Sequence, residues 1–331
     1  MKKKKPQVAV VRSSDPRDVR ACVEQVPFKA KRRDRVVVKI NLCSPLELTG
    51  VTNTRAETVD EVVRILREQG IKPVIAEGCG FPNDTRMAFL FNRIYPIAKR
   101  YGLELVDLNR DEGVEIGVKK PLVLEKIRIA RTVVEADYII SVCKLKTHFY
   151  TKVTLSLKNM MGALPWVNKH RMHHDFNHRL DGASFMKAAR EMFTLESDRE
   201  YTSKAVADLC SVITPHYAVI DGATAMEGSG PTYGRPKKAN LIISGNDPLA
   251  ADAVATYLMG FDPADVLLLR MAHGKGIGEM NLKKIKIHCD DNIEDLRLSF
   301  TDARVDDRIM SWLSHIGSVP FNRISHRIFK I

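Results

Sequence analysis

The first half of the chain alternates short β-branched runs with stretches whose apolar residues recur at helical spacing, and this alternation restricts the fold more than any other feature. Residues 36–40 form one such run, and residues 56–69 carry apolar residues on one helical face before Gly70 ends the pattern. Further strand-like runs lie at 73–76, 103–108 and 136–142, with a helical stretch at 85–101. Because strands separated by helices return to one sheet through right-handed crossovers, the sequence predicts an α/β fold with a mainly parallel sheet flanked by helices.

The second half repeats this pattern after a loosely organised middle. Histidine, methionine, asparagine and lysine are frequent up to about residue 200, and no clear strand can be drawn there. We therefore expect a two-lobed chain: an α/β lobe at 1–150, a His/Lys-rich insertion or cap at 151–200, a second α/β lobe at 201–290 and a basic amphipathic tail at 291–331. The two lobes could share one sheet, because no low-complexity linker separates them.

Composition argues against several classes of protein. No run of about 18 apolar residues occurs, and the N-terminal lysines lead into a strand-like segment rather than the apolar core of a signal peptide. The six cysteines lie far apart without a CxxC pair, so a ferredoxin-type iron-sulfur motif is absent and reduced thiols are expected. We therefore predict a cytoplasmic protein.

The positive charge favours anionic partners without choosing among them. The net charge is +12 and the pI is near 9.4. No nucleic-acid-binding motif accompanies this charge, so specific nucleic-acid binding is not expected. The tail beyond Arg308 carries apolar residues at helical spacing beside arginines, and it could contact a membrane surface peripherally or pack on a partner subunit of a homo-oligomer. Packing on its own chain is the favoured interpretation.

Charged and polar residues follow the predicted strands, where ligands bind in open α/β sheets. They are Lys39 and Asn41 in VVVKIN, Glu77 in AEGCG, Lys144, Lys146 and His148 in CKLKTH, and Asp221 in VIDG. Turn formers such as Asn and Asp commonly end strands for structural reasons. Lysines at the ends of two buried strands are harder to explain as packing, and they indicate a site.

The segment 143–174 carries lysines and histidines without a single acid. Crowded cations repel one another unless an anion binds, and such lysines lose protons more readily. We therefore predict a pocket for a carboxylate or a phosphate, which could also hold a catalytic base or a Schiff-base lysine. Lys158 lies in the apolar stretch TLSLKNMMG, where a lysine needs a partner, and Asn159 follows it. A solvated basic loop is the alternative.

Two further patterns are weaker. His170 and His174 are spaced four residues apart and could bind a divalent metal together with His148, although no acid stands between the two. The loop GSGPTYG, which follows Glu227 and contains Gly228 and Gly230, could present backbone N–H groups to an anion. It is not a P-loop, because no G-K-[ST] follows.

The order of these segments resembles the family called domain of unknown function 362. The most specific parts are the K-x-K-T-H, LKN-x-x-G and DG...EG-x-GP motifs, and the resemblance runs from about residue 36 to residue 278. The resemblance implies no established reaction. Some relatives carry a ferredoxin-like module, for which this chain lacks the cysteine quartet. A fainter architectural likeness is to nickel-dependent lactate racemases, and fold alone does not decide function.

The sequence is interpreted as that of an enzyme that binds an anionic small molecule in a Lys/His-lined cleft between the lobes. The predicted catalytic residues are Lys144, Lys146, His148 and Lys158. The predicted substrate-binding residues are Lys39, Asn41, Glu77, Asn159, Lys169, Asp221, Glu227, Gly228 and Gly230. Any metal would use His148, His170 and His174. The alternatives are a redox protein with a metal or iron-sulfur cofactor and a basic protein that binds nucleic acid or a membrane surface.

Overall fold

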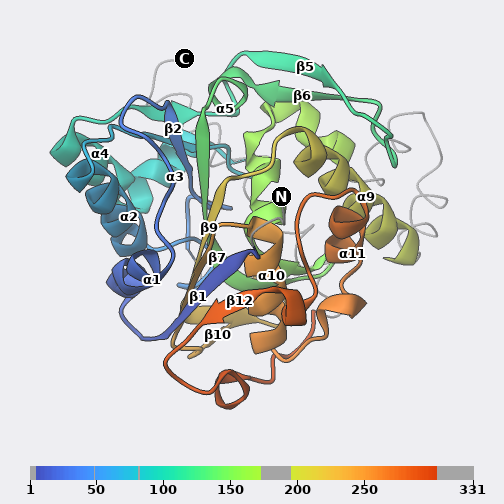
Figure 1. Cartoon of the computed structure of the whole chain (residues 1–331). Coiled ribbons are helices and arrows are strands. Elements are labelled where there is room, and N and C mark those ends of the chain that lie inside the picture. The colour runs from blue at the N-terminus through green and yellow to red at the C-terminus, as the bar shows by residue number, and fades with distance from the viewer. Residues whose placement is uncertain (1–4, 48, 81–82, 173–194, 304–331) are drawn as a thin grey trace.

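The computed structural model describes residues 5–47, 49–80, 83–172 and 195–303, and most described strands belong to one sheet (Figure 1). The order across this main sheet is β12-β1-β11-β9-β7-β2-β3-β4, with β8 beside β7 and β10 beside β9. Its strands are β1 Gln7–Arg12, β2 Val36–Lys39, β3 Val74–Glu77, β4 Leu105–Asp107, β7 Tyr138–His148, β8 Lys152–Thr154, β9 Tyr217–Glu227, β10 Arg235–Lys237, β11 Leu241–Gly245 and β12 Lys286–His288. A separate pair is formed by β5 Gly113–Gly117 and β6 Lys126–Ala130.

Parallel pairings dominate the main sheet. β4, β3, β2, β7 and β9 are successive parallel neighbours, and β1 is parallel to β12. β11 joins these two groups, because it is antiparallel to both β1 and β9. The predicted α/β class with a mainly parallel, helix-flanked sheet is thus confirmed. β1, from the beginning of the chain, lies between two strands from its end, so one sheet carries strands from both halves of the sequence.

Helices cover both faces of the sheet and bury a separate apolar core on each. The helices are α1 Val19–Gln25, α2 Ala56–Glu68, α3 Thr85–Phe91, α4 Ile94–Tyr101, α5 Arg131–Val134, α6 Ser156–Asn159, α9 Leu195–Val212, α10 Pro248–Leu258 and α11 Leu267–Gly274. Short 3-10 turns are η1 Pro16–Asp18, η2 Met160–Ala163, η3 Trp166–Met172, η4 Pro263–Asp265, η5 Leu282–Lys284 and η6 Ile293–Leu296. Val36 and Val38 pack with α1 to α4, whereas Val37 belongs to the core beneath α6, α9, α10 and α11. Successive strand residues point to opposite faces, which explains this division.

Two elements differ from the sequence expectation. The stretch 85–101 is two helices rather than one, because Asn92 ends α3 and Arg93 adopts the left-handed φ of 57°. The strand expected at 136–142 continues to His148, and all eleven residues of β7 are buried. Lys144 and Lys146 therefore lie within a core strand rather than in the loop after it.

Parts of the expected organisation fall outside the described residues, namely 173–194 of the insertion and 304–331 of the tail. The described part of the middle region contains β8, α6, η2 and η3, where no strand had been expected. No helix in the described ranges has the length and apolar character needed to cross a membrane.

Candidate functional site

Four adjacent strands of the main sheet, in the order β9-β7-β2-β3, bring most of the predicted site residues together. Lys39 ends β2 and Glu77 ends β3, while Lys144 and Asp221 face one another in the register of β7 and β9. All four side chains are essentially inaccessible to water. These residues therefore lie in the carboxyl-terminal part of the parallel sheet, where the sequence predicted them.

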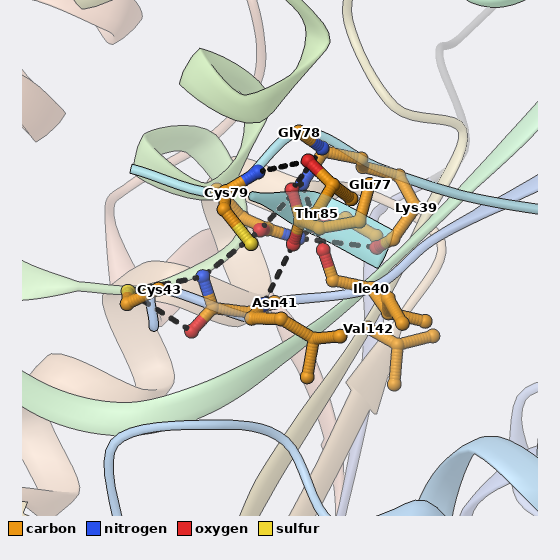
Figure 2. A network of polar contacts seen from close by, with 12 residues as sticks. Lys39, Ile40, Asn41, Cys43, Glu77, Gly78, Cys79, Thr85 and Val142 are labelled. Atoms are coloured by element: carbon orange, nitrogen blue, oxygen red, sulfur yellow. Dashed lines mark hydrogen bonds and ion pairs between the residues drawn. The ribbon is translucent and has the colours of Figure 1, made fainter. Parts of the chain in front are cut away.

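Lys39 and Glu77 form a buried ion pair that also holds the neighbouring loops (Figure 2). The Nζ atom of Lys39 lies 2.8 Å from Oε1 of Glu77 and donates to the backbone carbonyl of Ile40 at 2.7 Å. Glu77 accepts the backbone N–H of Leu42 at 2.7 Å and that of Gly78 at 2.7 Å. The carboxylate thus ties the ends of β2 and β3 together, and its charge is compensated within the protein.

Asn159 connects α6 to this pair. Its Oδ1 accepts from Nζ of Lys39 at 3.0 Å and from the Asn41 amide at 3.3 Å. Its Nδ2 donates to the carbonyl of Lys39 at 3.1 Å and to Oγ of Ser141 at 3.0 Å. Asn159 therefore positions Lys39, and Asn41 binds Asn159 rather than facing outward, so the asparagine of LKN has a structural role in this chain.

Lys144 and Asp221 form a second buried ion pair, with 2.9 Å between Nζ and Oδ2. Both side chains are fully buried. Asp221 also accepts the backbone N–H of Arg55 at 3.3 Å and that of Ala223 at 3.2 Å. Two of the predicted lysines thus have a carboxylate of their own on an adjacent strand.

Lys146 is buried without a carboxylate among its described partners. Its Nζ donates to the carbonyl of Thr52 at 2.7 Å, to the carbonyl of Pro231 at 3.3 Å and to Sγ of Cys43 at 3.0 Å. Backbone carbonyls carry only partial charges, so they stabilise the ammonium group without neutralising it.

Lys169, which reaches the cluster from η3, is held in a similar way. Its Nζ donates to the carbonyl groups of Gly78 at 2.6 Å and Cys79 at 2.8 Å, and to Oδ1 of Asn109 at 2.5 Å. Burial lowers the pKa of Lys169 from 10.5 to about 8, an effect that the carboxylate of Glu77 partly offsets.

Lys158 differs from the other buried lysines, because its one described partner is the thioether sulfur of Met161 at 2.9 Å. Its side chain is 9% exposed. Burial lowers the pKa of Lys158 to about 8, the Cys43 sulfur raises it slightly and the positive charge of Lys146 lowers it further. None of Glu77, Asp221 or Glu227, the acidic residues predicted at the site, pairs with it in the described structure.

The charge balance follows from these contacts. Five buried lysines meet at this end of the sheet, and the described structure provides paired carboxylates for two of them. Because Lys144, Lys146, Lys158 and Lys169 are buried, a solvated basic loop is the wrong interpretation for this part of the segment. The arrangement can hold negative charge that the described residues do not supply.

Two glycines allow the chain to approach the lysines closely. A Cβ atom on Gly78 would lie 2.6 Å from the carbonyl oxygen of Gly162 and 2.7 Å from Nζ of Lys169. A Cβ atom on Gly162 would lie 2.5 Å from Nζ of Lys39 and would overlap Oε1 of Glu77. The glycine of the LKN-x-x-G motif is thus required by packing against the ion pair.

His148 ends β7, and its side chain turns back on the following residues. Its Nδ1 accepts the backbone N–H of Tyr150 at 3.0 Å, and its ring stacks on Phe149. With Nδ1 accepting, a neutral ring carries its proton on Nε2. His174 and the side chain of His170 lie outside the described residues, so the predicted metal triad is described only at His148. Within the described ranges, no group of three or more metal-ligating side chains lies close enough to hold an ion.

The loop after β9 supports the lysine cluster through its backbone. Glu227 pairs with Lys237 at 2.9 Å and accepts the backbone N–H of Thr301, so its described contacts lie away from the buried lysines. The N–H of Gly228 donates to the carbonyl of Thr301, and the N–H of Gly230 donates to the carbonyl of Gly228. These N–H groups are satisfied within the protein, and the loop contributes the Pro231 carbonyl to Lys146 instead.

Sequence reasoning missed the residues that surround the lysines. Cys43, Thr52 and Met161 each contact a lysine ammonium, and Asn109 binds Lys169. Met161 stands three residues after Lys158, a spacing at which helical side chains meet, so it could have been found. The contributions of Thr52 and Asn109 have no local signal, because they come from loops distant in sequence.

Comparison with known proteins supports the family resemblance. A family model described as Domain of unknown function (DUF362) matches residues 36–257. The chain is similar to the thylakoid-associated protein sll1697 of Synechocystis sp., with 26% identity over 236 residues, which cover 71% of this chain and 66% of that protein. Among solved structures, it is similar to the lactate racemase apoprotein from Thermoanaerobacterium thermosaccharolyticum, with 12% identity, a TM-score of 0.42, and coverage of 77% of this chain and 57% of that chain.

Proposed function

The chain belongs to the DUF362 family, and we propose, from the lysine cluster, that it is an enzyme whose substrate is a small carboxylate or phosphate. The observation that carries the proposal is that Lys146, Lys158 and Lys169 are buried and form no ion pair in the described structure, since Glu77 and Asp221 pair with Lys39 and Lys144. Isolated buried ammonium groups are costly, and this cost falls when an anion binds beside them. A bound anion would supply the missing charge.

The proposed roles follow from the contacts of each side chain. The ion pairs of Lys39 and Lys144 hold four strands in position, so they preorganise the site. Lys146 and Lys158 attract the anionic group, and Lys158 is the better placed to act on it because only a thioether occupies its ammonium group. His148 is the proposed proton carrier, because an imidazole changes its charge near neutral pH.

The proposal is tested by thermal unfolding with a panel of anions that includes malonate, phosphate and citrate. We expect at least one anion to raise the unfolding temperature with a concentration dependence that follows mass action. Lys158→Met should abolish most of this response while leaving the unliganded protein as stable or more stable, because it removes a buried, unpaired charge. Lys126→Met, at an exposed position of β6, should keep the full response. If no anion stabilises the wild type, the proposal fails.

Anion binding is expected to weaken as the pH rises through about 8, because burial lowers the pKa values of Lys158 and Lys169 to about 8. Below that pH both lysines are charged in the folded protein, and a bound anion relieves the cost of their burial. In the unfolded chain they stay charged to higher pH, so the unliganded protein should gain stability as the pH rises from 8 towards 10.5. Unfolding scans with malonate, which is mostly a dianion at both pH values, at about pH 6.5 and about pH 9.5 measure the difference. A stabilisation that does not change with pH would contradict the lysine assignment.

Two finer points remain proposals. A cytoplasmic location is proposed for this chain, whereas the relative from Synechocystis sp. is named for its association with thylakoids, and cell fractionation distinguishes the two.

A divalent metal bound through His148, His170 and His174 is the alternative cofactor hypothesis. Metal analysis of protein purified without oxygen tests it, because the result reports bound metal directly.

A further inference from the structure

The ammonium group of Lys158 has a chemical environment that the other buried lysines lack. Lys39, Lys144, Lys146 and Lys169 each donate to at least one oxygen atom in the described structure. Lys158 instead meets the sulfur of Met161 at 2.9 Å. A thioether is a weak acceptor and carries no charge, so it stabilises an ammonium poorly and tolerates a neutral amine.

The backbone around Lys158 is firmly held, so the point from which its side chain extends is well defined. Asp252 accepts the backbone N–H of Ser156 at 2.8 Å and that of Leu157 at 2.9 Å, which fixes the start of α6. Asn159 fixes its end through Lys39 and Ser141. An amine on a rigid, buried element can be presented to a substrate with little loss of entropy.

The protonation state of Lys158 suits nucleophilic attack near neutral pH. Because burial lowers the pKa of Lys158 to about 8, roughly one tenth of the protein molecules carry this side chain as a free amine at pH 7. An ordinary surface lysine offers a far smaller fraction. The positive charge of Lys146, which acts on Lys158, also favours an anionic group of the same substrate beside this amine.

We propose that Lys158 forms an imine with a carbonyl compound that also carries a carboxylate or a phosphate. This inference rests on the proposed function and narrows its substrate class to compounds such as 2-oxo acids and phosphorylated aldehydes or ketones. The nitrogen lone pair attacks the carbonyl carbon, the carbonyl oxygen takes up protons, and the carbinolamine loses water to leave a protonated C=N bond. One amine, one carbonyl and one proton thus give one iminium ion and one water, without oxidation or reduction.

The test is reductive trapping on the full chain. The protein is incubated with pyruvate, glyoxylate or dihydroxyacetone phosphate, reduced with sodium borohydride, and digested for mass spectrometry of each lysine. We expect at least one compound to modify Lys158 about tenfold or more faster than the exposed Lys126, because burial increases the free-amine fraction of Lys158. Lys158→Arg keeps the positive charge but should abolish this adduct, whereas Lys169→Arg should retain it.

Anions without a carbonyl group separate this inference from the proposed function. If malonate or phosphate stabilises the protein but no Lys158 adduct forms, the imine is wrong and the anion-binding proposal stands. If the adduct forms mainly on Lys169 or on exposed lysines, or persists in Lys158→Arg, the imine at Lys158 is also overturned. If neither stabilisation nor an adduct occurs, both proposals fail.

Discussion

Lys144→Met is expected to lower the free energy of unfolding by about 3 to 5 kcal/mol, because it leaves Asp221 buried without its counter-ion. Both partners are fully buried, and 2.9 Å separates Nζ from Oδ2. The backbone N–H groups of Arg55 and Ala223 would still bind the carboxylate, but they carry no net charge. Chemical denaturation of wild type and variant measures the difference.

Two controls test whether the unpaired carboxylate of Asp221 causes this loss of stability. Lys126 pairs with Glu115 on the surface, so Lys126→Met should change the free energy of unfolding by roughly 0 to 1 kcal/mol. Combining Lys144→Met with Asp221→Asn should recover part of the loss, because the amide keeps an acceptor without a charge. A loss as small as that of the surface control, or a double variant no more stable than the single one, would show that the pair does not act as a buried ion pair.

Gly162→Ala is expected to destabilise the protein by roughly 1 to 3 kcal/mol and to disturb the lysine cluster at the same time. The added Cβ would lie 2.5 Å from Nζ of Lys39 and would overlap the Glu77 carboxylate. Neither group can move freely, because both are buried and bound to neighbouring loops. The variant should therefore lose stability and also respond less to anions.

Gly117→Ala in β5 is the matched control for this variant, because a Cβ atom there meets nothing within 4 Å. It should leave both stability and the anion response close to wild type. Thermal unfolding of both variants with and without phosphate measures the two effects together. If Gly162→Ala matches Gly117→Ala both in thermal stability and in its stabilisation by phosphate, the close approach of η2 to the ion pair matters for neither property.

The fold class was accessible from sequence because it depends on local periodicity. Apolar runs at 36–40 and 73–76 separated by an amphipathic helix require burial on both sides of a parallel sheet, whatever the remaining residues are. The periodicity says less about where helices and strands begin and end. It predicted one helix over 85–101, because the pattern of apolar residues does not reveal a left-handed residue such as Arg93.

The candidate site was found from sequence only as a set of charged residues near strand ends. Lys39, Glu77, Lys144 and Asp221 could be named, since the carboxyl ends of parallel strands meet at one edge of the sheet. The sequence could not show which lysine pairs with which carboxylate. That pairing depends on the strand order, which places β2 beside β3 and β7 beside β9. Lys144 and Asp221, for example, are more than 70 residues apart in the sequence.

The sequence by itself determined that lysines enter an apolar core, because CKLKTH and TLSLKNMMG place them among residues that must be buried. Only the tertiary structure decided which of these lysines is compensated. Lys144 receives a carboxylate from a neighbouring strand, whereas Lys158 receives a thioether from its own turn. The physical reason is that the cost of a buried charge depends on the few atoms around it, and those atoms come from parts of the chain that no local pattern relates.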